Sequence, residues 1–125
     1  MADTGMDAFV TFIYSPRPER AWHFYGETLG LELARDEGEA RIYAVAGKGY
    51  LGVCRAGPER PSVPEGVCLS LVTDQVDAWH ARLVAAGVVV TGPPEHLARY
   101  GVTSFFFRDP DGHLLEVQRF DQPFP

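Results

Sequence analysis

The chain has 125 residues, of which 46% are hydrophobic and 22% are charged, and its formal net charge is −6. This length favours one domain with a buried core, and an acidic chain without a basic patch argues against a nucleic-acid partner. No apolar run approaches the roughly 18 residues of a membrane helix, and the opening letters MADTGMDAF lack the regions of a secretory signal. We therefore expect a cytoplasmic protein with no membrane partner.

The first half of the chain predicts one helix among four strands. Residues 9–14 (FVTFIY) are typical of a strand, and residues 15–30 of a helix in which Pro18 suits the first turn and Gly30 ends the helix. Three short strands follow, with the letters LELARDE, ARIYAVAG and YLGVCRA. Residues 57–66 are a proline-rich connection.

The same order of elements then restarts. Residues 66–73 (GVCLSLVT) predict a strand, residues 74–87 a helix, and residues 88–91 (VVVT) a further strand. The letters YGVTSFFFRD and HLLEVQRF predict a hairpin across the turn DPDG at 109–112. Proline presets φ at the second position of such a turn, and glycine adopts a left-handed conformation without penalty.

The restart is visible in the letters as well as in the pattern. The tripeptide AWH occurs at residues 21–23 and again at 78–80, an offset of 57. The helix-ending glycines and the strand-opening valines have the same offset: Gly30 and Gly87, Val10 and Val67. Together with the matching order of elements, this offset indicates two tandem βαβββ modules.

Three segments cover nearly the whole chain: AWHFYGETLGLEL, VDAWHARLVAAGV and YGVTSFFFRDPDGHLLEV. They resemble the vicinal oxygen chelate superfamily, which includes glyoxalase I, extradiol dioxygenases and bleomycin-resistance proteins. The resemblance implies an α+β fold in which the two modules form a curled mixed sheet around a central cavity. This fold hosts both enzymes and binding proteins, so the chemistry depends on the residues of the site.

The resemblance also implies that residues 1–125 form a single domain of this superfamily. We expect module one at about residues 7–56, a linker at about 57–65 and module two at about 66–120. Relatives of this length commonly form homodimers, and we expect a homodimer here.

In metal-dependent members of the superfamily, each module supplies one ligand from its first strand, usually His, and one from its last strand, usually Glu. The DPDGxxxE pattern places the last ligand at Glu116, and alignment of GYLGVCR with HLLEVQR makes Gly52 its counterpart. The first-strand positions fall at Val10 and Val67. A slip of one residue would replace these two by the following pair: Phe9 and Cys68.

Valine and glycine side chains offer no metal donor, and a catalytic divalent cation normally takes about three protein ligands. We therefore expect the usual metal positions to be vacated and no cofactor to be needed; a divalent ion (Zn, Ni, Fe or Mn) is the alternative. An improvised set would combine Glu116 with His96 and Cys68. Of the other histidines, His23 and His80 lie on predicted helices, and His113 points away from the face of Glu116.

Period-two alternation predicts which side chains share the face of Glu116. These are Val10, Phe12, Tyr14, Gly52, Cys54, Val67, Leu69, Leu71, Leu114 and Gln118. A hairpin register in which paired residue numbers sum to 221 places Phe105 opposite Glu116 and Phe107 opposite Leu114. Tyr100, in the loop at 92–101, is a candidate for the pocket entrance. The predicted ligand contacts are Phe12, Tyr14, Cys54, Leu69, Tyr100, Phe105, Phe107 and Glu116.

Glu116 has several possible roles at this stage. It can anchor a ligand, bind a metal, or act as a catalytic acid or base. Alternatively, the face is a closed core and Glu116 pairs with Arg55 or Arg119. The two cysteines, Cys54 and Cys68, have no CxxC spacing, and we expect them to be buried free thiols.

Three functions are compatible with these features. The first is a metal-free protein that binds a small, partly apolar or cationic molecule in the module cavity or at a dimer interface. The second is a glyoxalase-like lyase or isomerase, or a dioxygenase-type enzyme, with Glu116 as catalytic base or metal ligand. The third is a structural or regulatory interaction domain.

Overall fold

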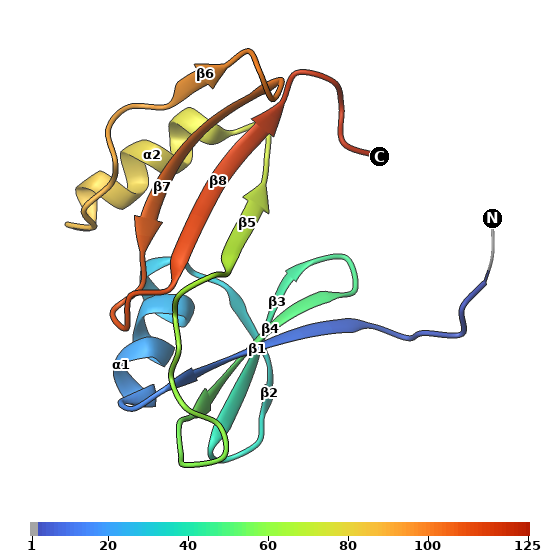
Figure 1. Cartoon of the computed structure of the whole chain (residues 1–125), viewed down its shortest axis with the longest axis vertical. Helices are drawn as coiled ribbons and strands as arrows, with labels where there is room; N and C mark the ends of the chain where they lie inside the picture. Colours follow the sequence, from blue (N-terminus) through green and yellow to red (C-terminus); the bar gives the residue numbers. More distant parts are fainter. Residues whose placement is uncertain (1–2) are drawn as a thin grey trace. The chain divides into compact units, whose positions relative to one another are not determined.

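A computed structural model describes residues 3–125. The chain divides after Val63 into two compact units, which we call unit 1 and unit 2 (Pro64–Pro125). Each unit contains one four-stranded mixed sheet, and the two sheets are separate in their hydrogen bonding (Figure 1). This arrangement confirms the α+β class and the repetition of one βαβββ topology.

Unit 1 has the predicted order of elements. They are β1 (Phe9–Ser15), α1 (Pro18–His23), the π-helix η1 (Phe24–Thr28), β2 (Glu32–Asp36), β3 (Ala40–Ala46) and β4 (Gly49–Arg55). The strands are arranged in the order β1-β4-β3-β2, with β1 parallel to β4 and the other pairs antiparallel.

One face of the unit 1 sheet is covered by α1. The Trp22 indole N–H donates to the Val53 carbonyl oxygen on β4 at 2.9 Å, and the Tyr43 hydroxyl on β3 donates to the Trp22 carbonyl oxygen at 3.2 Å. These two bonds attach the helix to the sheet while satisfying polar groups that would otherwise be buried without partners. The remaining core is apolar: Ile13, Ala21, Phe24, Tyr25, Leu29, Leu51 and Val53.

The single helix predicted at 15–30 is shorter and has two parts. After α1 the chain widens into η1, where the Leu29 N–H donates to the Phe24 carbonyl oxygen at 2.9 Å. This five-residue spacing defines a π-turn, which local sequence patterns do not distinguish from an α-helix.

Unit 2 repeats the topology. Its elements are β5 (Cys68–Val72), α2 (Val76–Ala85), β6 (Glu95–Leu97), β7 (Val102–Arg108) and β8 (Leu114–Phe120), in the sheet order β5-β8-β7-β6. The strand β5 is parallel to β8, as β1 is to β4. The core between α2 and this sheet contains Val76, Leu83, Phe105, Phe107, Leu115 and Val117.

The strand predicted at 88–91 is wrong. That segment forms an isolated bridge between Val90 and Phe107 but no strand, and the edge strand beside β7 is β6, within the predicted loop at 92–101. The valine run has strand propensity, but the chain continues through Gly92, at φ 138°, into two prolines. Prolines have no N–H to donate, so pairing with β7 resumes only beyond them.

Candidate functional site

Glu116 lies on β8, between Ser70 of β5 and Phe106 of β7 in the ladder. The side chains of β8 alternate: Leu115 and Val117 are buried toward α2, so Leu114, Glu116 and Gln118 point to the other face. We call this face, which lies on the side of the sheet away from α2, the open face of unit 2. It contains the predicted key residue.

The predicted hairpin register is wrong by one residue. Observed pairs sum to 222, so Phe106 lies opposite Glu116, and Phe105 and Phe107 lie opposite Val117 and Leu115. The physical reason is the turn, where the Asp109 N–H donates to the His113 carbonyl oxygen and leaves a three-residue loop. Such a loop is completed by a left-handed residue, here Gly112 at φ 93°.

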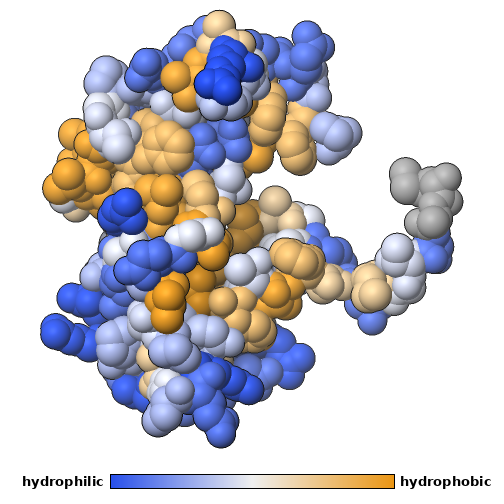
Figure 2. Space-filling view, viewed as in Figure 1, coloured by the Kyte–Doolittle hydropathy of each residue, from blue (hydrophilic) through white to orange (hydrophobic). Residues whose placement is uncertain are grey.

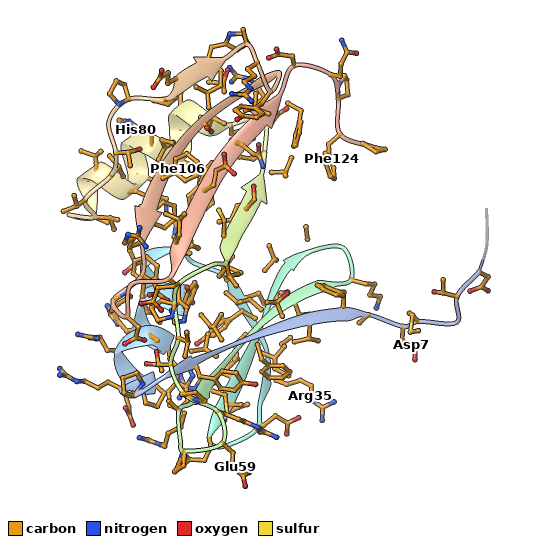
Figure 3. The ribbon with its side chains drawn as sticks, in the orientation of Figure 1. Asp7, Arg35, Glu59, His80, Phe106 and Phe124 are labelled. Carbon is orange, nitrogen blue, oxygen red and sulfur yellow. The ribbon has the colours of Figure 1, made fainter. Side chains whose placement is uncertain are left out.

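Phe105 and Phe107 consequently belong to the core under α2 rather than to the face of Glu116. They are 1% and 2% exposed, and the His80 ring meets the Phe105 ring edge-on with centroids 5.2 Å apart. Phe106 is the aromatic residue directly opposite Glu116 on the open face, and sequence reasoning missed it (Figure 3). Because residues 105–107 are all phenylalanine, the sequence shows no alternation of apolar and polar residues that could have identified Phe106.

The prediction of which β5 side chains share the face of Glu116 is also wrong. Cys68, Ser70 and Val72 share the open face, whereas Leu69 and Leu71 point toward α2 and Val67 precedes the strand. The partner of Gly52 on β1 is Phe12, and the partner of Glu116 on β5 is Ser70, so the strands repeat at 70 − 12 = 58 rather than 57. This offset favours Cys68 over Val67 as the β5 position that corresponds to Val10 on β1.

Cys68 is thus the unit 2 counterpart of Val10. Its thiol is an exposed free thiol, not a buried one, and its pKa is raised by partial desolvation and by the negative charge of Glu116. A raised pKa keeps the thiol protonated, and the thiolate is the form that binds metals and attacks electrophiles.

In unit 1 the predicted face is confirmed. Val10, Phe12 and Tyr14 on β1 lie beside Tyr50, Gly52 and Cys54 on β4, on the side of the sheet away from α1. Figure 2 shows hydrophobic groups at the surface along β1, where Phe12 is 44% exposed. This is the open face of unit 1.

The Phe12 ring lies directly across Gly52. A Cβ at residue 52 would be 2.5 Å from Phe12 Cδ1 and 3.1 Å from Cζ, and closer still to Cε1. A glutamate at this place would collide with the ring. At the positions where metal-dependent relatives carry ligands, unit 1 offers Val10 and Gly52, which have no donor, and a phenyl ring occupies the intervening space. These residues do not fit a metal.

Neither arginine pairs with Glu116. Arg55 binds Glu19, at 2.8 Å, and Glu39, and Arg119 donates to the Asp74 carbonyl oxygen at 3.5 Å. Within residues 3–125, the Glu116 carboxylate makes no hydrogen bond or ion pair. The alternative of a core carboxylate neutralised by arginine is therefore wrong.

Other polar groups share the open face of unit 2. The Gln118 amide donates to the Ser70 hydroxyl, and the Ser104 hydroxyl is buried without a hydrogen-bond partner among the described residues. A pocket of about 390 Å³ adjoins the Leu114 end of this face. It is lined by Pro64, Glu65, Gly66, Val67, Cys68, Arg108 and Leu114. Its volume is within the range of small-molecule sites.

One cluster of possible metal donors lies in the β7–β8 turn, where the ligand atoms of Asp109, Asp111 and His113 are within 4.8 Å of one another. Asp109 already accepts hydrogen bonds from the N–H groups of Asp111 and His113 and pairs with the His113 Nδ1 at 2.9 Å. These contacts stabilise the turn and raise the pKa of His113, chiefly through the bond to Asp109.

His96 lies opposite Thr103 in the ladder, on the α2 side of the sheet rather than on the open face that contains Glu116. The His96 Nε2 is 2.9 Å from a carboxylate oxygen of Asp121, so the combination of His96 with Glu116 and Cys68 is not assembled. Tyr100 is 64% exposed, with the Arg99 guanidinium 5.3 Å from its ring centroid. Its role at a pocket entrance stays a prediction.

Comparison with known proteins identifies the family. The model of the Glyoxalase/Bleomycin resistance protein/Dioxygenase superfamily matches residues 6–117. The chain belongs to this superfamily. None of the helices in residues 3–125 has the length and hydrophobicity needed to span a membrane.

Individual relatives differ in activity. The chain is 42% identical over 52 residues to the metallothiol transferase FosB of Shouchella clausii (strain KSM-K16), a match that covers 41% of this chain and 35% of that protein. Among solved structures, TnmS3, an antibiotic binding protein from Streptomyces sp. CB03234, has a TM-score of 0.76 and 27% identity, over 94% of this chain and 98% of that one. Lactoylglutathione lyase from Agrobacterium tumefaciens has a TM-score of 0.72 and 22% identity, over 89% and 91%, and shares the fold.

Proposed function

We propose that this protein binds small, partly apolar molecules without a metal, and that its preferred ligands carry a positive charge or a hydrogen-bond donor. The observation that carries the proposal is the Glu116 carboxylate, which is half-buried on an open sheet face and has no partner in residues 3–125. A carboxylate in this environment gains a charge-assisted hydrogen bond when a cationic group replaces its water.

The metal-free part of the proposal is supported by unit 1. Val10 and Gly52 offer no donor, and Phe12 covers Gly52. The likeness to TnmS3, which is described as an antibiotic binding protein, supports a binding role rather than catalysis. The cytoplasmic location and the homodimer expected from the sequence stay predictions.

The test is a thermal-shift screen of cationic, neutral and anionic small molecules, followed by titration of each hit. Glu116→Gln keeps the shape of the side chain and removes its charge. We expect this variant to fold normally and to bind cationic hits about tenfold or more weakly. Glu59→Gln, an exposed carboxylate in the connection between β4 and β5, is the matched control. A Glu116→Gln protein with unchanged affinity for every hit would reduce Glu116 to a packing residue.

A metal-dependent enzyme is the second candidate, because FosB, a metallothiol transferase, is 42% identical over its matching segment. In that case Glu116 would act as a base or as a ligand together with the Cys68 thiol, whose raised pKa disfavours the thiolate. Metal retention by the purified protein separates the two candidates.

A further inference from the structure

The C-terminal tail, residues 121–125, leaves the end of β8 and turns back away from α2 (Figure 1). Two contacts hold its first residue: the Asp121 N–H donates to the Gly101 carbonyl oxygen at 2.8 Å, and its carboxylate pairs with His96. Phe124 then returns to β8, and its ring centroid lies 5.1 Å from that of Phe120 with the planes at 35°. The two rings form a tilted aromatic contact.

Phe120 lies on the open face of unit 2. It occurs four residues after Glu116 on β8, so the two side chains point to the same side of the sheet. Their Cα atoms are about 13 Å apart at the usual rise of a strand. Phe106, opposite Glu116 in the ladder, adds a ring near the carboxylate. The face therefore has a negative charge in its middle and an aromatic pair at its end.

The aromatic pair is accessible. Phe124 is 63% exposed, although its ring packs on Phe120, so the outer face of the pair is in contact with solvent (Figure 3). An exposed ring held in place by a short, anchored segment can stack on a second ring with little loss of conformational entropy. The Asp121 contacts supply that anchoring.

We infer that the Phe120–Phe124 pair is an aromatic subsite which, with Glu116, selects a planar ring system joined to an alkylammonium group. This inference rests on the proposed function and deepens it by naming the ligand class. The ring stacks on the exposed side of Phe124, and the ammonium group reaches back along β8 and binds the Glu116 carboxylate. Residues 121–125 are then part of the binding site.

Two probes separate the two contacts. Quinacrine has an acridine ring and a protonated alkylamine chain, whereas acridine has the ring without the chain. Both are fluorescent, so each is titrated against the full chain at neutral pH. We expect Phe124→Ala to weaken both probes, by roughly three- to tenfold, because it removes the ring that each stacks on. Glu116→Gln should weaken quinacrine and leave acridine unchanged.

Phe9→Ala is the matched control, because Phe9 is also an exposed phenyl ring, at 72%, but lies on β1. The affinity of the Phe9→Ala protein for both probes should equal that of the wild type. Thermal denaturation checks that all variants are folded. Unchanged binding of both probes by Phe124→Ala overturns the aromatic subsite, while a loss of quinacrine affinity in Glu116→Gln would still uphold the proposed function. A wild-type protein that binds neither probe overturns the ligand class, and one that also binds nothing in the broader screen overturns the proposed function.

Discussion

The contact between Phe12 and Gly52 shows how a single residue changes what a sheet face can do. The phenyl ring lies against the backbone of β4 at a place where any side chain would collide with it. Gly52 is buried by this contact, although it lies on the open face. Where metal-dependent relatives carry a charged metal ligand, this sheet face is therefore flat and apolar. The flat surface depends on both residues, because the Phe12 ring can lie there only if residue 52 is glycine.

The first prediction tests this dependence. Gly52→Ala introduces a methyl group that collides with the Phe12 ring and forces the ring to rotate. We therefore expect a loss of about 1–3 kcal/mol in the free energy of unfolding. Urea denaturation measures this loss. Gly57→Ala is the control, because no atom lies within 4 Å of a Cβ built there.

The cost should disappear when the ring is absent. Adding Gly52→Ala to a Phe12→Ala protein should therefore change the free energy of unfolding much less than it does in the wild type. Equal losses for Gly52→Ala in both backgrounds, or a loss no larger than that of Gly57→Ala, would contradict the interpretation of this contact.

At the scale of elements, the turn between β7 and β8 decides which side chains accompany Glu116. The Asp109 carboxylate organises this turn through hydrogen bonds to the N–H groups of Asp111 and His113 and through its pair with the His113 ring. Asp109 and His113 are both buried. The three-residue loop that results places Phe106, rather than Phe105, opposite Glu116.

The second prediction uses the raised pKa of His113, caused first by its hydrogen bond to Asp109. A group whose pKa is higher in the folded than in the unfolded chain stabilises the fold fully below its unfolded value, 6.5 here, and loses this contribution as pH rises through the folded value. The wild type should therefore exceed His113→Gln in stability by the largest margin near pH 6, and by less at pH 9.

Urea denaturation of both proteins between pH 6 and pH 9 measures the margin. His23→Gln, an exposed histidine on α1, is the control for general effects of pH on the chain. A margin between wild type and His113→Gln that is constant or grows with pH would show that the ion pair does not supply the stabilisation.

At the scale of the whole molecule, two units with the same topology present different chemistry. Unit 1 has an apolar open face around Phe12, and unit 2 has an open face with Glu116, Ser70 and Gln118. The net charge of −6 favours cationic over anionic ligands at long range. Under the proposed function, charge recognition therefore belongs to unit 2.

The third prediction concerns metal content. After exposure to Zn, Ni, Fe, Mn and Co and then desalting, elemental analysis should find much less than one metal ion per chain, because unit 1 supplies no donor at the usual positions. Stoichiometric retention that is lost in Glu116→Ala, but not in Glu59→Ala, would favour the metal-dependent enzyme. Retention lost in Asp109→Asn would instead locate the ion in the β7–β8 turn.

The sequence by itself determined the repeated topology, the superfamily, the strand that contains Glu116 and the open face of unit 1. These features depend on local signals: the glycines and prolines that end elements, the repeated AWH tripeptide, and the alternation of side chains along β1 and β4. The DPDGxxxE pattern located Glu116 because the turn and the strand are adjacent in the chain.

Only the tertiary structure decided which side chains surround Glu116. Both the FFF run in β7 and the CLSLV run in β5 leave the phase of the strand open, because apolar or small residues occur on both faces. The phase is set by hydrogen bonds that the pattern does not contain, namely those of the Asp109 carboxylate in the turn and those between β5 and β8. The tail contact between Phe120 and Phe124 and the position of Phe12 across Gly52 likewise depend on how folded segments meet, since no periodicity in the letters encodes either contact.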